Sequence, residues 1–254
     1  MRQGLLTACL MLWAWPAFAQ VSHGSTRESH TGTTGSASEA SFTIASFDWG
    51  TPEGGFVCTF QLAAGAHIAT AVDWGGIAGT AVATGLATTT AGDEDGSTQL
   101  WSFPSIPSGT STITITRTNN ATVLYAIAHS DEASSAASVY EPGIVLASGQ
   151  ISHGEDAVDD GSPGTDSARH TCNYSGIGAV PSAGANSTTT LSIDFGAITA
   201  AVYMETTPGQ GSRNVGPASG TTDDVANVSF AMIQTPAAGT NCGDGLLIGV
   251  NRCR

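Results

Sequence analysis

The chain has 254 residues, of which 21 are Asp or Glu and only 7 are Lys or Arg, so its net charge at pH 7 is -14. Nucleic acids and anionic membranes attract basic surfaces, so this charge argues against both as partners. Only 11% of the residues are charged. A soluble surface must therefore come mainly from Thr, Ser, Asn and Gly, which is typical of exported β-proteins.

The first nineteen residues have the pattern of a secretory signal peptide. Arg2 is followed by an almost wholly apolar run at 5–15, and then by Ala17-Phe18-Ala19, which is a small-x-small cleavage site. A membrane anchor needs about 20 apolar residues, so the run is too short for one. We expect cleavage before Gln20, residues 1–19 as the signal peptide, and no membrane insertion of the mature chain.

Cleavage of this kind indicates a secreted, extracellular or cell-surface protein, with the periplasm as an alternative. It also excludes nucleotide cofactors, which belong to the cytoplasm. Leu6-Thr7-Ala8-Cys9 has the form of a lipoprotein signal, but most of the apolar region follows it rather than precedes it. We therefore favour ordinary cleavage over lipidation.

Residues 20–40 are rich in Ser, Thr and Gly and show no apolar periodicity, so they are expected to form a flexible arm. From Ser41 onward the chain is a series of short strand patterns separated by Gly, Pro, Asn and Asp. No segment of 10–15 residues has a convincing helical period. The expected strands are 42–47, 55–62, 67–74, 98–103, 110–117, 121–129, 143–151, 188–195, 197–206, 225–235 and 246–250.

Two of these segments carry the strongest signals. Residues 110–117, TSTITITR, alternate so that Ile113 and Ile115 face inward and the threonines face outward. Residues 121–129, ATVLYAIAH, form an apolar run that predicts a central strand. Asn119-Asn120 between them predicts a two-residue hairpin turn.

This pattern predicts an all-β, antiparallel β-sandwich of jelly-roll or immunoglobulin-like type over residues 41–254. We expect either one two-halved sandwich or two small tandem sandwiches. The halves would be 41–148 and 171–254, joined by an acidic loop at 149–170.

Four cysteines remain after signal cleavage, and four cysteines in an exported chain suggest two disulfides. Cys242 and Cys253 flank a short apolar hairpin-sized segment, so we pair them, and this leaves Cys58 with Cys172. Free buried thiols are the alternative. Metal binding by the cysteines is disfavoured because they lack CxxC spacing.

Two acidic clusters have residue types that suit Ca²⁺, which prefers carboxylate and carbonyl oxygens on a tight loop. Asp93 and Asp95 precede a glycine in the first cluster, and the second contains Asp156, Asp159 and Asp160. Neither cluster has the glutamate of an EF-hand at the required distance. A solvated loop is therefore the alternative in each case, and no cofactor is required beyond this possible Ca²⁺.

His153 and His170 flank the second acidic cluster, where a histidine beside carboxylates can serve a transition metal or a general base.

Three tryptophans lie on or beside the expected strands. Trp49 and Trp74 belong to a repeated Asp-Trp-Gly triplet, and Trp101 lies within a strand pattern. Aromatic rings on a β-face can stack on sugars, but tryptophans also have a large area to bury. They are thus either a carbohydrate-binding platform or part of the core.

Nucleophile motifs are absent from the sequence: there is no G-x-S-x-G, no S-x-x-K with its partner motifs and no H-E-x-x-H. The chain also contains no lysine, which excludes Schiff-base chemistry. A pair of carboxylates for glycoside hydrolysis remains an alternative. We expect a protein that is not an enzyme.

The order of these patterns resembles a family of Gly/Thr/Ala-rich β-sandwich proteins found among phage structural proteins and bacterial exported proteins. The matching pieces are Val72-Asp73-Trp74-Gly75-Gly76, Gln99-Leu100-Trp101-Ser102-Phe103, residues 107–116, Tyr125-Ala126-Ile127-Ala128 and residues 227–233. The resemblance implies a sandwich fold without a catalytic signature. The signal peptide and the extension that holds Cys242 and Cys253 depart from the family and favour an exported bacterial protein.

We therefore expect an exported, non-enzymatic structural or surface-interaction protein, in a cell envelope or in a phage-like particle. Its partners would be copies of itself or other surface or particle subunits, and its location would be the virion if a phage encodes it. A secreted carbohydrate-binding module with a polysaccharide partner is one alternative. A secreted hydrolase is the other.

Overall fold

The computed structural model describes residues 21–29, 40–50, 54–62, 66–90, 95–118, 124–133, 137–161, 166–196 and 198–234. Within these ranges the chain is almost entirely antiparallel β-structure, with one 3-10 turn at Glu141–Gly143 (η1). The all-β prediction is confirmed. The expected signal peptide, the expected strand at 246–250, Cys242 and Cys253 lie outside the described residues.

The strands form three main sheets. The central sheet has the order β1-β9-β3-β7-β6, with β1 at Val21–Ser29, β9 at Leu124–Ala133, β3 at Gly54–Gln61, β7 at Gly96–Phe103 and β6 at Thr80–Thr89. The small outer sheet has the order β2-β8-β4-β5, at Ser41–Asp48, Thr110–Arg117, Ala69–Trp74 and Ile77–Ala78. The large outer sheet has the order β10-β17-β13-β15-β14, at Ala137–Val139, Thr222–Gln234, Ala168–Ser175, Thr199–Glu205 and Ser187–Asp194, and β11 (Val145–Ser152) also pairs with β17.

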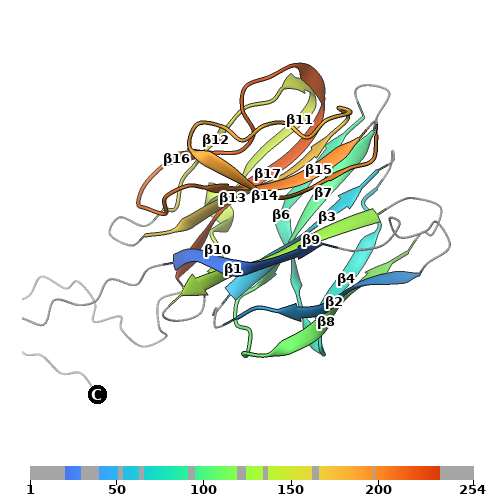
Figure 1. The fold of residues 1–254 in the computed structure, drawn as a ribbon, viewed down its shortest axis with the longest axis vertical. Helices are drawn as coiled ribbons and strands as arrows, with labels where there is room; N and C mark the ends of the chain where they lie inside the picture. The colour runs from blue at the N-terminus through green and yellow to red at the C-terminus, as the bar shows by residue number, and fades with distance from the viewer. Residues whose placement is uncertain are drawn as a thin grey trace, which may run out of the picture.

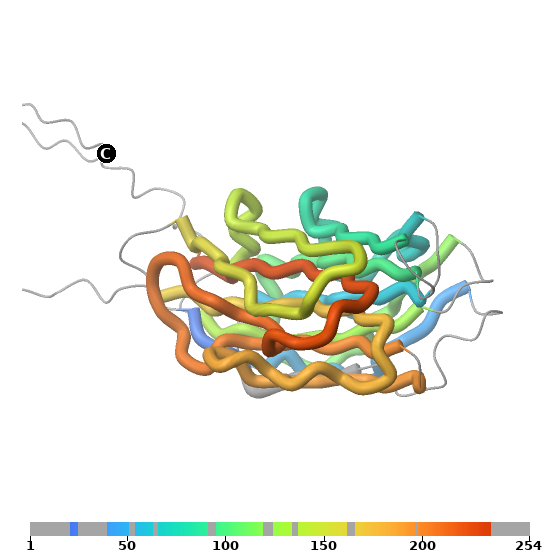
Figure 2. Tube along the Cα trace, turned by 90° about the horizontal axis from the view of Figure 1, so that it is seen from above, coloured from blue at the N-terminus to red at the C-terminus, as the bar shows by residue number. Residues whose placement is uncertain are grey.

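The central sheet lies between the two outer sheets, so the protein is a stack of three layers (Figure 1). Viewed from above, the strands of the second half of the chain lie over the central sheet (Figure 2). One core fills the space between the central and large outer sheets and contains Phe56, Phe60 and Phe230. The second core fills the space between the central and small outer sheets and contains Trp49 and Trp101.

This arrangement explains why the inner strands are apolar on both faces. On β3, Phe56 and Phe60 point into the first core, while Val57 points into the second. All eight residues of β3 and of β7 are buried. The apolar run that predicted a central strand is the start of β9, which pairs with β1 and β3.

A two-stranded ribbon covers the outer face of the large outer sheet. It consists of β12 (Asp156–Val158) and β16 (Arg213–Val215). Val158 and Val215 of the ribbon pack with Ala231 of β17. This cover explains why β13 is buried along its whole length.

Three expectations of chain organisation are wrong. The expected hairpin between residues 110–117 and 121–129 is absent from the described strands, because β8 belongs to the small outer sheet and β9 to the central sheet, and Asn119-Asn120 themselves lie outside the described residues. Residues 149–170 are not a plain loop, since they contain the end of β11, all of β12 and the start of β13. The change from one half to the other falls between β9 and β10, because both β10 and β11 belong to the large outer sheet.

The expected flexible arm is also wrong in part, because residues 21–29 form β1 at the edge of the central sheet. This polar strand is held by backbone pairing, because β1 pairs antiparallel with β9. Val21 is fully buried in the first core, and its N–H donates to the carbonyl oxygen of Asp166 at 3.1 Å. Residues 30–39 lie outside the described ranges.

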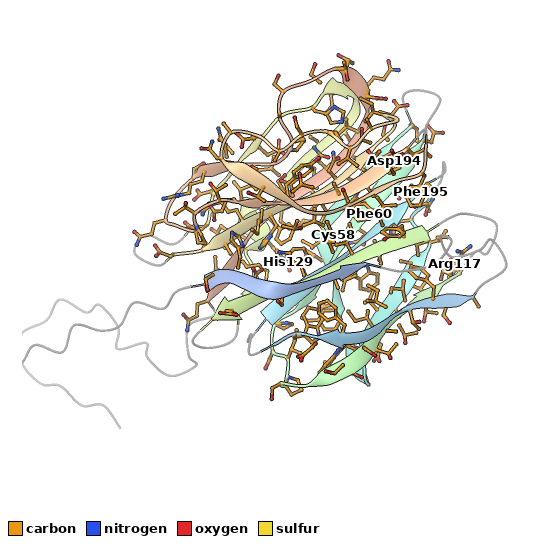
Figure 3. The ribbon with its side chains drawn as sticks, in the orientation of Figure 1. Cys58, Phe60, Arg117, His129, Asp194 and Phe195 are labelled. Carbon is orange, nitrogen blue, oxygen red and sulfur yellow. A yellow bond between two sulfur atoms is a disulfide. The ribbon has the colours of Figure 1, made fainter. Side chains whose placement is uncertain are left out.

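The disulfide between Cys58 and Cys172 confirms that pairing. It joins β3 of the central sheet to β13 of the large outer sheet across 114 residues of sequence, with a Cα–Cα distance of 6.1 Å. Both cysteines are fully buried, and Figure 3 labels Cys58 between the two layers.

Irregular pairing occurs in four strands at the edges of the sheets. The register shifts in β1 between His23 and Arg27, in β2 between Ile44 and Phe47, in β6 between Ala81 and Leu86 and in β14 between Thr189 and Leu191. Such bulges are a common device by which proteins prevent their edge strands from pairing with other chains. Among the described residues, no helix has the length and apolar character that crossing a membrane would need.

Candidate functional site

The three tryptophans belong to the second core, so the alternative of an exposed carbohydrate platform is wrong for them. Trp49, Trp74 and Trp101 are 1%, 5% and 4% exposed. The Trp74 Nε1–H donates to the carbonyl oxygen of Phe47, and the Trp101 Nε1–H donates to Thr59 Oγ1. All three rings are therefore part of the core.

The acids suggested for Ca²⁺ do not converge in the described part of the chain. The Asp95 carbonyl oxygen accepts a hydrogen bond from the Tyr174 hydroxyl, and Asp159 Oδ1 accepts one from the N–H of Gly161. Asp156 Oδ2 accepts from Ser229 Oγ at 2.7 Å, and burial raises the pKa of this aspartate in spite of that bond. Asp93 lies outside the described residues.

Asp160 is committed to a buried ion-pair network around Arg169. The guanidinium contacts Asp160 Oδ2 and Glu205 Oε1, both at 3.1 Å, and it also donates to the carbonyl oxygens of Gly209 and Gly211. Burial raises the pKa of Glu205, and the charge of Arg169 opposes this effect. The network holds the end of β15 and the following loop against β13, because Arg169 on β13 binds Asp160, Glu205 and two backbone carbonyl oxygens at once.

An array of hydroxyl groups lies on the outer side of the small outer sheet, and one carboxylate, Asp73, pairs with Thr114 beside it. We call the array the hydroxyl face; it consists of Ser41, Thr43, Thr70, Thr112, Thr114 and Thr116. Thr114 is half-buried and the others are exposed. Ser41 pairs with Thr116 and Thr43 with Thr114 across the ladder between β2 and β8, so the hydroxyls stand in rows at the spacing of the sheet. This is the alternation that the sequence predicted for 110–117.

A cluster of three histidines surrounds one aspartate between the central and large outer sheets; we call it the histidine–aspartate cluster. His23 comes from β1, His129 and Asp131 from β9, and His170 from β13. His129, Asp131 and His170 are fully buried, and Figure 3 shows His129 in this interlayer space. The cluster thus connects three strands of two sheets.

The aspartate is the common partner in the cluster. His170 Nε2 lies 2.9 Å from one Asp131 oxygen and 3.1 Å from the other. Nδ1 of His23 and Nδ1 of His129 lie 3.5 and 3.9 Å from Asp131 Oδ1. The ring centroid of His170 lies 4.9 Å from that of His23 and 4.7 Å from that of His129.

The surroundings of the cluster fix the orientations of its rings. His23 Nε2 donates to the carbonyl oxygen of Glu205 at 2.8 Å, so its Nδ1 faces Asp131. The His129 ring stacks on Phe56 with a centroid distance of 5.1 Å and an angle of 10°. Phe56 and Phe230 also contact the His170 ring, at centroid distances of 4.6 and 5.6 Å. Aromatic side chains thus form an apolar wall around the polar centre.

Two opposing effects set the charge of Asp131. Burial alone raises the pKa of this carboxyl, but the charge of His170, its hydrogen bond and the neighbouring His129 outweigh it and hold the pKa below its ordinary value. The site therefore favours a carboxylate anion inside the protein. A buried anion of this kind requires a cation beside it.

Sequence reasoning placed His170 beside the wrong acids and missed the other members of the cluster. His153 does not contact the acids beside it in the sequence. It bonds instead to Ser175 Oγ and to the carbonyl oxygen of Thr221. The spacing His129-x-Asp131 at the end of an expected central strand was the available signal, because residues i and i+2 share one face. His23 carried no signal, since its strand was expected to be an arm.

A polar pocket of about 440 Å³ opens beside the Arg169 network. Its lining residues are Asn186, Glu205, Thr206, Thr207, Ser212, Arg213 and Asn214. Arg213 is held in place by hydrogen bonds to the carbonyl oxygens of Thr207 and Gln210. The lining therefore holds amides, hydroxyls, one carboxylate and one guanidinium.

Comparison with known proteins identifies no relative of this chain: no protein-family model matches it, and neither a curated protein nor a solved structure is similar to it.

Proposed function

We propose that this protein is an exported, non-enzymatic surface-interaction protein that docks against a neighbouring subunit of a cell envelope or particle. The observation that carries the proposal is the hydroxyl face. It is an ordered and exposed surface, and its hydroxyl groups both donate and accept hydrogen bonds.

Four of the edge strands are poor partners for a further strand. Strands β1, β2, β6 and β14 carry register shifts that hinder such pairing, whereas the edge strand β11 pairs with β17 without a shift. The threonines of β8 alternate with buried isoleucines, and the register shifts in its two ladders lie on the neighbouring strands β2 and β4.

The start of β1 supports export with cleavage before Gln20. Cleavage there leaves one residue ahead of Val21, which is already buried in the first core. The disulfide between Cys58 and Cys172 is compatible with an oxidising compartment. The large ionisable clusters lie inside the protein, which supports a binding role over a catalytic one.

The test is to place positive charge on the hydroxyl face and to measure how much protein stays in the envelope or particle fraction. The double variant Thr112→Arg with Thr116→Arg changes two exposed positions on β8. Exposed substitutions of this type change the free energy of unfolding by about 0.5 kcal/mol or less. We expect the variant to fold normally and to move into the soluble fraction.

A matched control places the same charges on the other outer sheet. Thr188→Arg with Ser192→Arg changes two exposed positions of β14 and should leave the distribution as in the unmodified protein. If the β8 variant stays in the envelope or particle fraction as well as the control does, the hydroxyl face is not the docking surface.

The polar pocket favours a second candidate function, which is binding of a carbohydrate. Its amide and hydroxyl side chains suit sugar hydroxyls, although no aromatic ring lines it. Asn214→Ala would then weaken binding of polysaccharides in a pull-down with insoluble glycans. Equal retention of Asn214→Ala and unmodified protein, or no retention of either, would remove this candidate.

A further inference from the structure

We propose that the histidine–aspartate cluster is a binding site for a divalent transition metal, with His23, Asp131 and His170 as its ligands and Zn²⁺ as the probe. One possible ligand atom from each of these residues lies within 4.8 Å of the other two. This site is independent of the hydroxyl face and of the proposed docking function.

The ligand types and their spacing suit a metal of this class. Imidazole nitrogen together with one carboxylate oxygen is a common donor set for Zn²⁺ and its neighbours. With bonds of about 2.0–2.2 Å, ligand atoms around a tetrahedral Zn²⁺ lie roughly 3.3 Å apart. The distance of 3.5 Å between His23 Nδ1 and Asp131 Oδ1 is close to this value, and the 3.1 Å between His170 Nε2 and Asp131 Oδ1 is slightly shorter than it.

The outer contacts of the ligands support the assignment. A histidine that binds a metal usually donates its second ring N–H to a backbone carbonyl or a carboxylate, which fixes the tautomer. His23 does so, because its Nε2 donates to the Glu205 carbonyl oxygen and its Nδ1 is left to face Asp131. His129 Nδ1, 3.9 Å from Asp131 Oδ1, stands at the border of the site as an outer partner of the carboxylate.

The charge of the site points to a cation. The Asp131 carboxylate is fully buried among aromatic rings, and a buried anion is stable only beside positive charge. A divalent metal bound to two neutral imidazoles supplies that charge. A protonated His170 without any metal supplies it as well, so the experiment must separate these two states.

Metal binding at this place would fasten the N-terminal strand to the rest of the protein. His23 is on the edge strand β1, whereas Asp131 and His170 lie on β9 and β13. The His23 side chain is 9% exposed and Asp131 is 0% exposed, so the route into the site runs past β1. Bound metal should therefore slow the opening of this strand.

The test uses the exported full chain with its disulfide intact, dialysed against a chelator and titrated with Zn²⁺ by calorimetry. We expect one Zn²⁺ per chain, a melting temperature that rises with Zn²⁺ concentration, and slower amide hydrogen exchange in residues 21–29. His23→Gln and Asp131→Asn should each weaken Zn²⁺ binding by roughly a hundredfold or more, since loss of an outer partner alone costs about 10–100-fold. His153→Gln changes a buried histidine outside the cluster and should bind as the unmodified protein does.

A measurement on the unmodified protein covers the case in which the buried variants fail to fold. Imidazole nitrogen NMR should show Zn²⁺-dependent shifts for His23 and His170 and none for His67 and His153. Absence of binding heat together with an unchanged melting temperature at excess Zn²⁺ would overturn the metal site in favour of the protonated pair. Binding with equal affinity in His23→Gln, or shifts confined to histidines outside the cluster, would overturn it as well.

Discussion

His67 is a histidine whose ring is satisfied in its neutral form. Its Nε2 lies 2.8 Å from Thr59 Oγ1 and its Nδ1 lies 2.7 Å from Ser97 Oγ. The Thr59 hydroxyl donates to the carbonyl oxygen of Gln99, so the His67 Nε2–H donates to Thr59 and the Ser97 hydroxyl donates to His67 Nδ1. Burial lowers the pKa of His67 to about 4.

This lowered pKa predicts a loss of stability in mild acid. Between pH 6.5 and 4 the unfolded chain binds a proton at His67 that the folded protein does not, so the free energy of unfolding falls as the pH falls through this window. The loss from His67 is at most about 3 kcal/mol. Urea denaturation at pH 7, 6, 5 and 4 measures it, and His67→Gln should flatten the curve.

His153 has a lowered pKa for the same reason, namely burial, and contributes in the same direction. Asp156 and Glu205, whose pKa values burial raises, oppose this trend because they favour protonation in the folded state. An unchanged slope in His67→Gln would show that other groups control the acid sensitivity.

Trp74 illustrates the value of buried aromatic area. Its ring packs in the second core, 6.3 Å from the centroid of Trp49, and its Nε1–H is bonded to the Phe47 carbonyl oxygen. Trp74→Ala should lower the free energy of unfolding by about 3–5 kcal/mol, measured by urea denaturation. A loss below about 1 kcal/mol would mean that the ring is not in the core.

At the scale of elements, strands with clean alternation or long apolar runs were predictable, and polar buried strands were not. Residues 110–117 and 225–235 correspond to β8 and β17. Strand β13 was not predicted, because Arg169, His170 and Asn173 are polar residue types that usually lie on the surface. Their partners are on distant strands, and the sequence does not show these pairings: Glu205 for Arg169 and Asp131 for His170.

The disulfide joins two elements whose contact defines the first core. Because it closes a separation of 114 residues, Cys58→Ala with Cys172→Ala should lower the free energy of unfolding by about 5 kcal/mol in the chain-entropy model. Guanidinium denaturation of the double variant beside the unmodified protein measures the loss. Equal stabilities would show that the bond does not restrain the unfolded chain.

Strand β1 depends on a glycine for its close approach to β9. A Cβ on Gly24 would lie 2.2 Å from Ser130 Oγ and 2.4 Å from the backbone oxygen of Ser130, and the backbone cannot move aside. Gly24→Ala should therefore loosen β1 and speed amide exchange in residues 21–29 at least tenfold, with little change elsewhere.

Gly154 provides the control for this prediction, since a Cβ there meets nothing within 4 Å. Gly154→Ala should leave exchange in β1 unchanged. Exchange in residues 21–29 that is equally slow in Gly24→Ala would contradict the close packing of β1 on β9.

At the scale of the whole molecule, the sequence indicated an all-β sandwich-type protein but not its three layers. Strong apolar patterns identify strands, but they do not say which sheet a strand joins; β8 and β9 are neighbours in sequence and belong to different sheets. The candidate sites followed the same rule. The hydroxyl face could be predicted from local alternation. The histidine–aspartate cluster could not, because its members come together only through pairing between distant strands.

We propose that this chain is exported and works as a docking protein on a surface or particle. Mass spectrometry of a fractionated culture tests it most directly, with separate samples of cytoplasm, envelope, medium and particles. The account predicts a chain that begins at Gln20, with Cys58 and Cys172 oxidised, concentrated in the envelope or particle fraction. A chain that keeps residues 1–19 and remains in the cytoplasm, or one found only free in the medium, would contradict it.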